Sequence, residues 1–252
     1  MNIGFLGFGR TGKEAVYPFL TDETVNIRWI LKKSNEYHRK YASDLLLINK
    51  EKEGEIFSEA DWNEDFLEKY PVDIVVDFSN AENIEKYATF AKFGIKIVSA
   101  ISNYRPKQIE LLNEIAKQTP VFWSPNITLG VNLLITVAKI INEFTPEADI
   151  QIIESHFKEK KEISGTAGKI AESLHIPKED IHSIRAGGIL GKHEIVFGYP
   201  YQTISLMHET GSGKAFGRGA LACAKWITDK PNGLYNMEEM LNDQLRKYLS
   251  KL

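Results

Sequence analysis

A glycine-rich segment near the start of the chain constrains the fold more than any other feature. The residues Gly7-Phe8-Gly9-Arg10-Thr11-Gly12 follow a short apolar run and precede a helical pattern. Between a strand and a helix, glycines at this spacing permit a tight turn and let a pyrophosphate approach the free N–H groups of the helix N-terminus. The motif alone is a weak signal and also fits an ordinary strand–helix turn. In this context it predicts a dinucleotide-binding fold.

The first half of the chain alternates short apolar runs with helical patterns. The predicted strands are 2–6, 26–31, 73–78, 96–100 and 121–123, and the predicted helices are 10–20, 64–68, 81–93 and 106–118. This alternation indicates right-handed βαβ crossovers. It therefore predicts an α/β fold with a doubly wound parallel sheet of the Rossmann type.

The pattern changes after residue 126. Predicted helices at 131–144 and 166–174 accompany predicted strands at 148–156, 183–187, 193–198 and 202–209. Consecutive strands joined by glycine-rich turns usually pair antiparallel. We therefore expect a smaller α+β domain with a mainly antiparallel sheet over 127–216, which binds substrate and supports oligomerisation. Residues 1–126 and 217–252, with helices at 217–227 and 237–249, form the expected dinucleotide-binding domain.

The composition narrows the functional classes. Among 252 residues the formal net charge is −3, and the pI is about 6.1. An acidic chain is a poor candidate for nucleic-acid binding, which depends on many Lys or Arg contacts with phosphate. The single Cys223 makes no internal disulfide, which fits the cytoplasm. The sequence shows no signal peptide, no apolar run long enough to span a membrane and no His/Cys/Asp cluster with zinc-like spacing, so we expect no membrane and no metal.

The second predicted strand ends in Lys32 and Lys33, without the carboxylate that usually binds the ribose 2′-OH of NAD. Two lysines suit a 2′-phosphate, so NADPH is preferred over NADH, although a lysine pair is also common on solvated surfaces. Polar loops at strand ends line such grooves or cap helices. The expected cofactor-binding residues are Gly7, Phe8, Gly9, Arg10, Thr11, Gly12, Lys32, Lys33, Phe78, Ser79, Ala100, Ser102 and Asn126.

A second polar constellation spans 154–167. A buried-type strand runs into His156, Lys160 follows, and Ser164-Gly165-Thr166 begins a helix. An imidazole, an ammonium group and the free amides of a helix start together suit a carboxylate ligand. The alternative is a solvated charged loop followed by a capped helix.

The sequence resembles the dihydrodipicolinate reductase family, and the resemblance covers nearly the whole chain. The matching segments are Gly9–Gly12, Asp77–Ser79, Pro125–Leu134, Glu154–Ala167, Gly188–Ile195, Lys225–Trp226 and Gly233–Met237. The chain departs from the family pattern at five places. Phe157 replaces a second histidine, the segment between Glu154 and Ser164 is one residue short, and Glu162-Ile163 stands where the family has Asp-x-Pro. The nicotinamide-side loop reads Ala100–Asn103, and Ser212-Gly213 stands where the family has Ser-Arg, with Lys214 adjacent.

The resemblance implies the NAD(P)H-dependent reduction of 4-hydroxy-tetrahydrodipicolinate, a cyclic dicarboxylate, in lysine biosynthesis through diaminopimelate. It also implies a homotetramer. His156 and Lys160 are then the catalytic residues, the first as orienting partner and the second as proton donor. Substrate-binding residues are Ser164, Gly165, Thr166 and Lys214. The alternatives are another imino- or amino-acid dehydrogenase, and a cofactor sensor without turnover.

Overall fold

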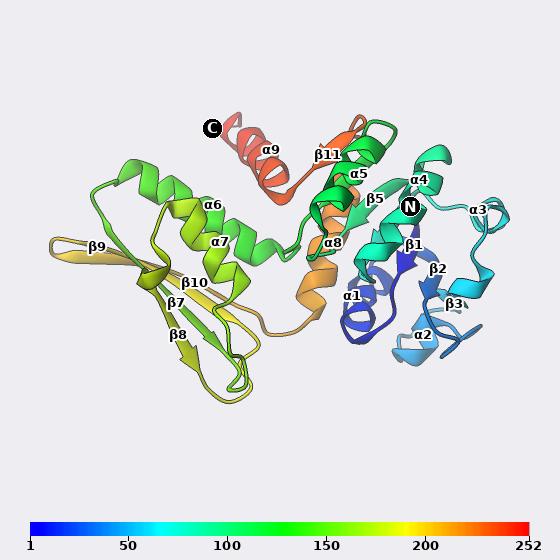
Figure 1. Cartoon of the computed structure of the whole chain (residues 1–252), viewed down its shortest axis with the longest axis horizontal. Helices are drawn as coiled ribbons and strands as arrows, with labels where there is room; N and C mark the ends of the chain where they lie inside the picture. Colours follow the sequence, from blue (N-terminus) through cyan, green and yellow to red (C-terminus); the bar gives the residue numbers. More distant parts are fainter. Residues whose placement is uncertain (252) are drawn as a thin grey trace. The chain divides into compact units, whose positions relative to one another are not determined.

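The apolar run after Met1 forms strand β1 (Asn2–Leu6), an inner strand of a seven-stranded parallel sheet in the computed structural model, which describes residues 1–251 (Figure 1). The strand order is β11-β6-β5-β4-β1-β2-β3. The other six strands are β2 (Asn26–Lys32), β3 (Glu55–Ser58), β4 (Ile74–Asp77), β5 (Lys96–Ser99), β6 (Pro120–Trp123) and β11 (Gly233–Tyr235). Order and direction confirm the predicted doubly wound sheet.

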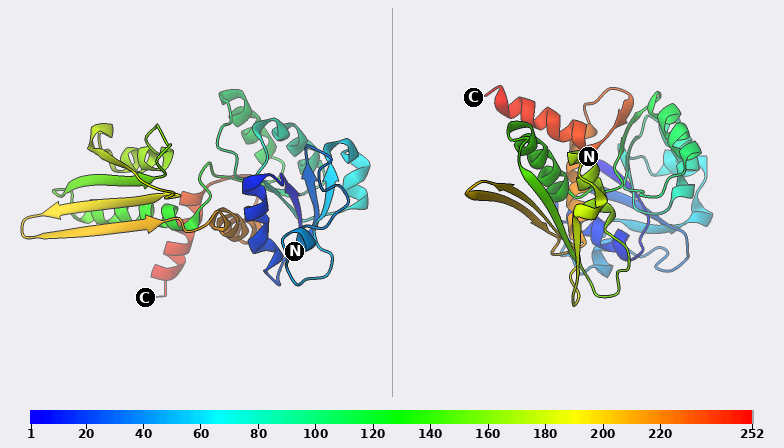
Figure 2. Two further views of the ribbon diagram at one scale, coloured as in Figure 1. Left: turned by 90° about the horizontal axis from the view of Figure 1, so that it is seen from below. Right: turned by 60° about the vertical axis from the view of Figure 1, so that its left-hand side comes forward.

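Helices cover both faces of this sheet, because its strands are apolar on both sides. Helices α1 (Arg10–Leu20) and α8 (Lys214–Ile227) pack on each other on one face, and α4 (Ile84–Lys92) and α5 (Pro106–Ala116) cover the other (Figure 2). The remaining helices of this unit are α2 (Ala42–Leu45), α3 (Glu64–Lys69) and α9 (Met237–Leu249), with 3₁₀ turns at Glu59–Asp61 and Ala81–Asn83. One core cluster centres on Trp29, Tyr87 and Phe90, each fully buried.

The register of the parallel strands brings their carboxyl ends to one edge. Leu6 pairs with Asp77, and Asp77 pairs with Ser99. The loops after β1, β4 and β5 therefore begin side by side. In open parallel sheets, this edge is where ligands bind.

The second unit is built on a four-stranded sheet in the order β10-β9-β7-β8. Its strands are β7 (Asp149–His156), β8 (Ile181–Arg185), β9 (Lys192–Tyr199) and β10 (Gln202–Glu209), and its helices are α6 (Leu129–Phe144) and α7 (Gly165–Leu174), with a 3₁₀ turn at Lys178–Asp180. Its core packs α6 and α7 against one face of the sheet, around Ile152, Ile195 and Phe197.

The sequence predicts that the consecutive strands 183–187 and 193–198 pair antiparallel, but the corresponding strands β8 and β9 do not pair with each other, because β7 lies between them. β7 pairs antiparallel with β9, and β9 with β10, but β7 pairs parallel with β8. Helix α7 lies between β7 and β8 in the chain and forms a βαβ crossover, which returns the next strand in the same direction. The sheet is therefore mixed.

The chain divides into two compact units, Met1–Thr128 with Gly213–Leu252, and Leu129–Ser212. The boundaries expected from sequence fell at 126/127 and 216/217. The second boundary lies earlier because α8 begins at Lys214 rather than at Gly217. Lys214 thus belongs to the first unit.

Candidate active site

The glycine loop between β1 and α1 requires glycine at two positions. Gly7 has φ +94°, and a Cβ there would lie 2.8 Å from the carbonyl oxygen of Phe78. A Cβ on Gly12 would lie 2.5 Å from the carbonyl oxygen of Gly7. The loop closes tightly on itself and on the next loop along the sheet edge.

The N-terminus of α1 fits a dinucleotide pyrophosphate. Gly9 is its N-cap, no side chain caps the helix, and no acidic residue lies in its first turn. A Cβ on Gly9 would meet nothing within 4 Å, so a side chain there would fill only the space in front of the helix. Free amides with the positive end of the helix dipole bind phosphate in such a cradle.

A hollow of about 310 Å³ lies beside this loop. It is lined by Gly7, Phe8, Gly9, Leu31, Lys32, Lys33, Ser34, Glu59, Phe78, Ser79, Asn80 and Asn83. Seven of the thirteen predicted cofactor residues are therefore brought together. The other six do not line it: Arg10, Thr11, Gly12, Ala100, Ser102 and Asn126.

Lys32, which lines this hollow, already interacts with neighbouring side chains. Its ammonium group forms an ion pair with Glu36 and donates to the Ser34 hydroxyl at 2.9 Å. The same ammonium lies 5.1 Å from the ring centroid of Tyr37, whose hydroxyl accepts a hydrogen bond from Lys13. Glu36 was not among the predicted cofactor residues, although a glutamate four residues after a lysine indicates such an ion pair.

A buried polar network anchors the loops that follow β4 and β5. Asp77 is fully buried, and its carboxylate accepts from the Ser79 amide at 2.7 Å and from the Tyr87 hydroxyl at 2.7 Å. The Tyr104 hydroxyl donates to Tyr87 at 3.1 Å and lies 2.9 Å from the Ser99 hydroxyl. Burial raises the pKa of Asp77 to about 6, although these hydrogen bonds oppose the shift.

Two further predicted residues lie in the first unit. Asn126 forms an Asx turn before α6, where its side chain accepts from the amide and the hydroxyl of Thr128. Lys214 begins α8, and its ammonium lies 3.3 Å from the ring centroid of Tyr17. Lys214 therefore lies in a different unit from the other predicted substrate-binding residues.

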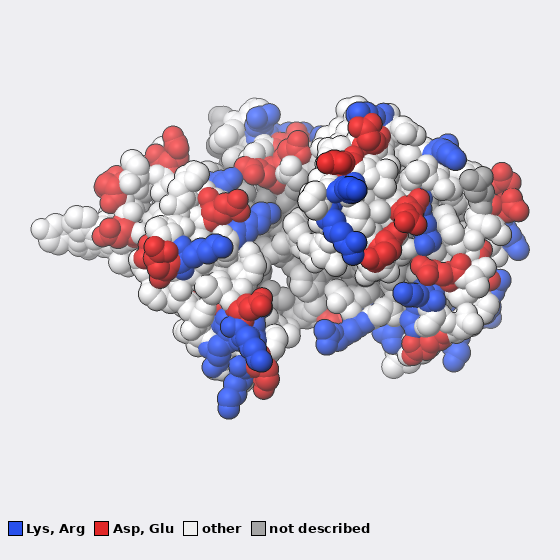
Figure 3. Space-filling model, in the orientation of Figure 1, with Lys and Arg blue, Asp and Glu red and all other residues white. Residues whose placement is uncertain are grey.

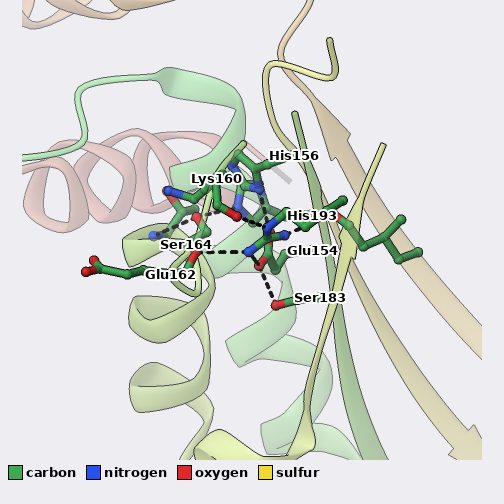
Figure 4. A network of polar contacts seen from close by, with 10 residues as sticks. Glu154, His156, Lys160, Glu162, Ser164, Ser183 and His193 are labelled. Atoms are coloured by element: carbon green, nitrogen blue, oxygen red, sulfur yellow. Dashed lines mark hydrogen bonds and ion pairs between the residues drawn. The ribbon is translucent and has the colours of Figure 1, made fainter. Parts of the chain in front are cut away.

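The end of β7 holds a buried ion pair. Glu154 is fully buried, and its carboxylate contacts Nδ1 of His156 and accepts from the Ser183 hydroxyl and the Arg185 guanidinium, each at 2.6 Å (Figure 4). Burial alone would raise the pKa of this carboxyl. The hydrogen bonds from its three partners outweigh burial and lower its pKa to about 2.

This ionised carboxylate fixes the orientation of His156. An ionised carboxylate only accepts, so Nδ1 of His156 carries the proton that it donates to Glu154. Nε2 is then the atom that remains for other chemistry. It lies beside Gly191, where an added Cβ would come within 3.2 Å of it.

Arg185 holds the lysine-rich loop against the sheet. Besides Glu154, its guanidinium donates to the carbonyl oxygens of Lys160 at 2.8 Å and Glu162 at 2.9 Å. Register explains the contact, since Arg185 pairs with His156 across β7 and β8. No local sequence pattern indicates this role of Arg185, because the pairing is a long-range property of the sheet.

Ser164 is the N-cap of α7, and its hydroxyl accepts from the Thr166 amide at 3.2 Å. The same hydroxyl lies 3.0 Å from Nε2 of His193, whose ring packs edge-on against His156 at 5.3 Å between centroids. Figure 4 shows Lys160 and Ser164 beside the two imidazoles, whereas the Glu162 carboxylate points away. The structure thus brings His156, Lys160 and Ser164 together, as the sequence predicted.

The end of the small sheet carries basic side chains, and the described residues offer neither a metal-binding group nor a membrane-spanning helix. Basic side chains gather at the end of the sheet where β7 and β8 finish (Figure 3), in the segment that carries Lys158, Lys160 and Lys161. Within residues 1–251, no three His, Cys, Asp or Glu side chains form a metal-binding group. The described helices include none that is long and apolar enough to cross a membrane.

Comparison with known proteins gives a consistent family. The model of the dihydrodipicolinate reductase N-terminus matches residues 1–127, and that of the C-terminus matches residues 130–241. The 4-hydroxy-tetrahydrodipicolinate reductase of Rickettsia bellii is 34% identical over 198 residues, which cover 71% of this chain and 79% of that protein. The enzyme of the same name from Caldanaerobacter subterraneus is 33% identical, with 69% and 78% covered.

Solved structures show the same fold. A dipicolinate-bound dihydrodipicolinate reductase from Paenisporosarcina sp. TG-14 has a TM-score of 0.77 at 20% identity, covering 94% of this chain and 97% of that one. An amine dehydrogenase from Mycobacterium smegmatis has a TM-score of 0.67 at 12% identity, with 94% and 95% covered. With both family models and these relatives in agreement, the chain belongs to the dihydrodipicolinate reductase family.

Proposed function

We propose that the chain reduces 4-hydroxy-tetrahydrodipicolinate to tetrahydrodipicolinate with NAD(P)H, in lysine biosynthesis through diaminopimelate. The observation that carries the proposal is the cluster at the end of β7. There Glu154 orients His156, and Lys160 and the N-terminus of α7 lie alongside. The family relatives at 33–34% identity carry the same enzyme name, which supports this assignment.

The substrate is a dicarboxylate, so the acidic chain must gather positive charge locally. Ser164, Gly165 and Thr166 at the start of α7 supply the hydroxyl and amide donors for one carboxylate. Lys160 adds a cation on the same loop. Lys214, on α8 of the first unit, is the further cation that we assign to the substrate.

The cofactor is assigned to the first unit. The amides after Gly9 would hold the pyrophosphate, and Lys32 and Lys33 would hold a 2′-phosphate, which favours NADPH over NADH. Phe78 and Ser79 line the hollow next to the glycine loop, and we assign Ala100, Ser102 and Asn126 to the nicotinamide half of the groove. The reduced nicotinamide supplies the hydride.

The protein supplies charge stabilisation and the proton. As the ring is reduced, negative charge develops on the substrate, and His156 stabilises that charge by a hydrogen bond from Nε2 when this second ring nitrogen also carries a proton. Lys160 donates the proton from Nζ. A positioned general acid contributes about 10²- to 10⁴-fold to the rate.

We also propose a homotetramer in the cytoplasm. Ile184 and Met207 project from the face of the small sheet opposite α6 and α7, and are 49% and 59% exposed. Exposed apolar side chains on an open sheet face favour pairing with a second copy. The buried thiol Cys223 shows that the fold needs no disulfide, which supports a reducing compartment.

The test is NADPH oxidation coupled to the enzyme that makes the substrate, repeated with NADH. We expect absorbance at 340 nm to fall only when the cyclic dicarboxylate is present, and faster with NADPH. Tight NADPH binding without turnover would identify a cofactor sensor instead. Oxidation of NADPH with other imino acids, but not with this substrate, would identify a different dehydrogenase.

A further inference from the structure

His193 is a buried imidazole that the mechanism above does not use. It lies on β9, is 4% exposed and faces α7. Its Nε2 atom lies 3.0 Å from the Ser164 hydroxyl. Its Nδ1 atom is buried and has no hydrogen-bond partner among the residues that the structure describes.

These contacts decide which nitrogen carries the proton. Burial, together with the charges of nearby His156, His208 and Lys160, lowers the pKa of His193 to about 4, so the ring is neutral at pH 7 and holds one proton. Nδ1 lacks a partner in either tautomer, but a buried N–H without an acceptor is rarer in native proteins than a buried acceptor without a donor. The proton therefore sits on Nε2 and is donated to Ser164.

The tautomer of His193 determines what Ser164 can do. The Ser164 oxygen then accepts two hydrogen bonds, from Nε2 of His193 and from the Thr166 amide at 3.2 Å. A serine oxygen has two acceptor positions and one proton to donate. With both acceptor positions occupied, the hydroxyl proton of Ser164 serves only as a donor, at a helix N-terminus that already attracts anions.

We propose that His193 is a positioning residue that makes Ser164 an obligate hydrogen-bond donor, so that the start of α7 binds a carboxylate of the substrate. The inference rests on the proposed dicarboxylate substrate. It assigns no chemical step to His193, which acts through Ser164.

Dipicolinate is a stable cyclic dicarboxylate with which to measure this effect. We compare its Kd for the full-length protein with bound NADP⁺ by calorimetry, using the variants Ser164→Ala, His193→Phe, His193→Gln and the double variant Ser164→Ala/His193→Phe. Loss of a hydrogen bond to a charged group weakens binding by about tenfold or more, so each of the variants Ser164→Ala and His193→Phe should raise Kd by about that factor. His193→Gln, whose amide can donate from a similar place, should stay within about threefold of wild type.

Non-additivity separates this role from a structural one. If His193 acts through Ser164, the double variant binds no more weakly than Ser164→Ala, within about twofold. His193→Phe should raise KM for the substrate and leave kcat within about threefold. His182→Gln is the matched control, because His182 is an exposed histidine of the same sheet whose ring contacts Gln151 rather than Ser164, and its Kd should match wild type.

Additive losses in the double variant, or normal binding by His193→Phe, would overturn the inference while the proposed function stands. If His193→Gln binds dipicolinate as weakly as His193→Phe, the loss comes from packing alone, and the inference is also overturned. If wild-type protein binds NADP⁺ but not dipicolinate, the dicarboxylate assignment fails, and this inference fails with it.

Discussion

Among single residues, the proposed preference for NADPH depends most on Lys32, whose ammonium is paired with Glu36. Lys32 lines the hollow beside the glycine loop, but its ammonium is already paired with the Glu36 carboxylate. A 2′-phosphate must compete with that carboxylate for the same cation. The lysine pair alone therefore gives too strong a prediction of NADPH preference, because Glu36 lies beyond the end of the strand and competes for Lys32.

The variant Glu36→Gln should relieve this competition. We expect the affinity for 2′,5′-ADP to rise about two- to fivefold, the range of an exposed ion pair, while the affinity for 5′-ADP changes little. Lys32→Glu should do the opposite and raise KM for NADPH more than for NADH. Titration calorimetry measures both ligands, and Glu51→Gln, an exposed change in the same unit, is the control. Equal changes for the two nucleotides would remove Glu36 and Lys32 from cofactor selection.

At the scale of elements, the carboxyl ends of β4 and β5 depend on one buried carboxyl. Asp77 joins the Ser79 loop to Tyr87 on α4, and Tyr104 continues the network to the loop after β5. Burial raises its pKa to about 6, above the unfolded value of 3.8. Because the folded state holds this proton more tightly, Asp77 contributes stability at low pH that is lost as pH rises from about 4 to about 6.

Asp77→Asn should remove this pH dependence. We expect the free energy of unfolding of the variant, relative to wild type, to rise by about 1–3 kcal/mol between pH 4 and pH 6.5. Urea denaturation at several pH values measures the difference, and other titrating groups cancel between the two proteins. Parallel pH profiles for the two proteins would show that Asp77 titrates as an ordinary carboxyl.

The loop between β7 and α7 is positioned by another element, β8, through Arg185. Its guanidinium neutralises the buried Glu154 and holds the carbonyl oxygens of Lys160 and Glu162. Removing one partner from a buried ion pair leaves an uncompensated charge, which costs about 3 kcal/mol.

Arg185→Met should therefore destabilise the protein by about 3 kcal/mol. It should also release the loop, so that trypsin cleaves faster after Lys158, Lys160 or Lys161. The double variant Glu154→Gln/Arg185→Met, which has no unpaired charge, should regain part of the stability while the loop stays sensitive to trypsin. Unchanged cleavage in Arg185→Met would show that the loop holds its position without this residue.

At the scale of the whole molecule, local patterns predicted the architecture well. Alternating apolar runs and the glycine loop predicted the parallel sheet. The order of His156, Lys160 and Ser164 in the sequence predicted the polar cluster at the end of β7. Strands β3 and β11 were missed because each carries only two apolar residues, Ile56 and Phe57 in β3 and Leu234 and Tyr235 in β11. Strand β8 was expected beside β9 because the two are consecutive in the chain, whereas β7 lies between them. The roles of Arg185 and His193 depend on contacts between strands, which no local pattern contains.

We propose that Lys160 donates the proton in the reduction. The most direct measurement is kcat for NADPH oxidation by Lys160→Met, with Lys158→Met, an exposed lysine of the same loop, as its control. We predict that Lys160→Met loses about 10²-fold or more in kcat while its Kd for NADPH is unchanged, and that Lys158→Met keeps near-normal turnover. Near-normal turnover by Lys160→Met would contradict the account.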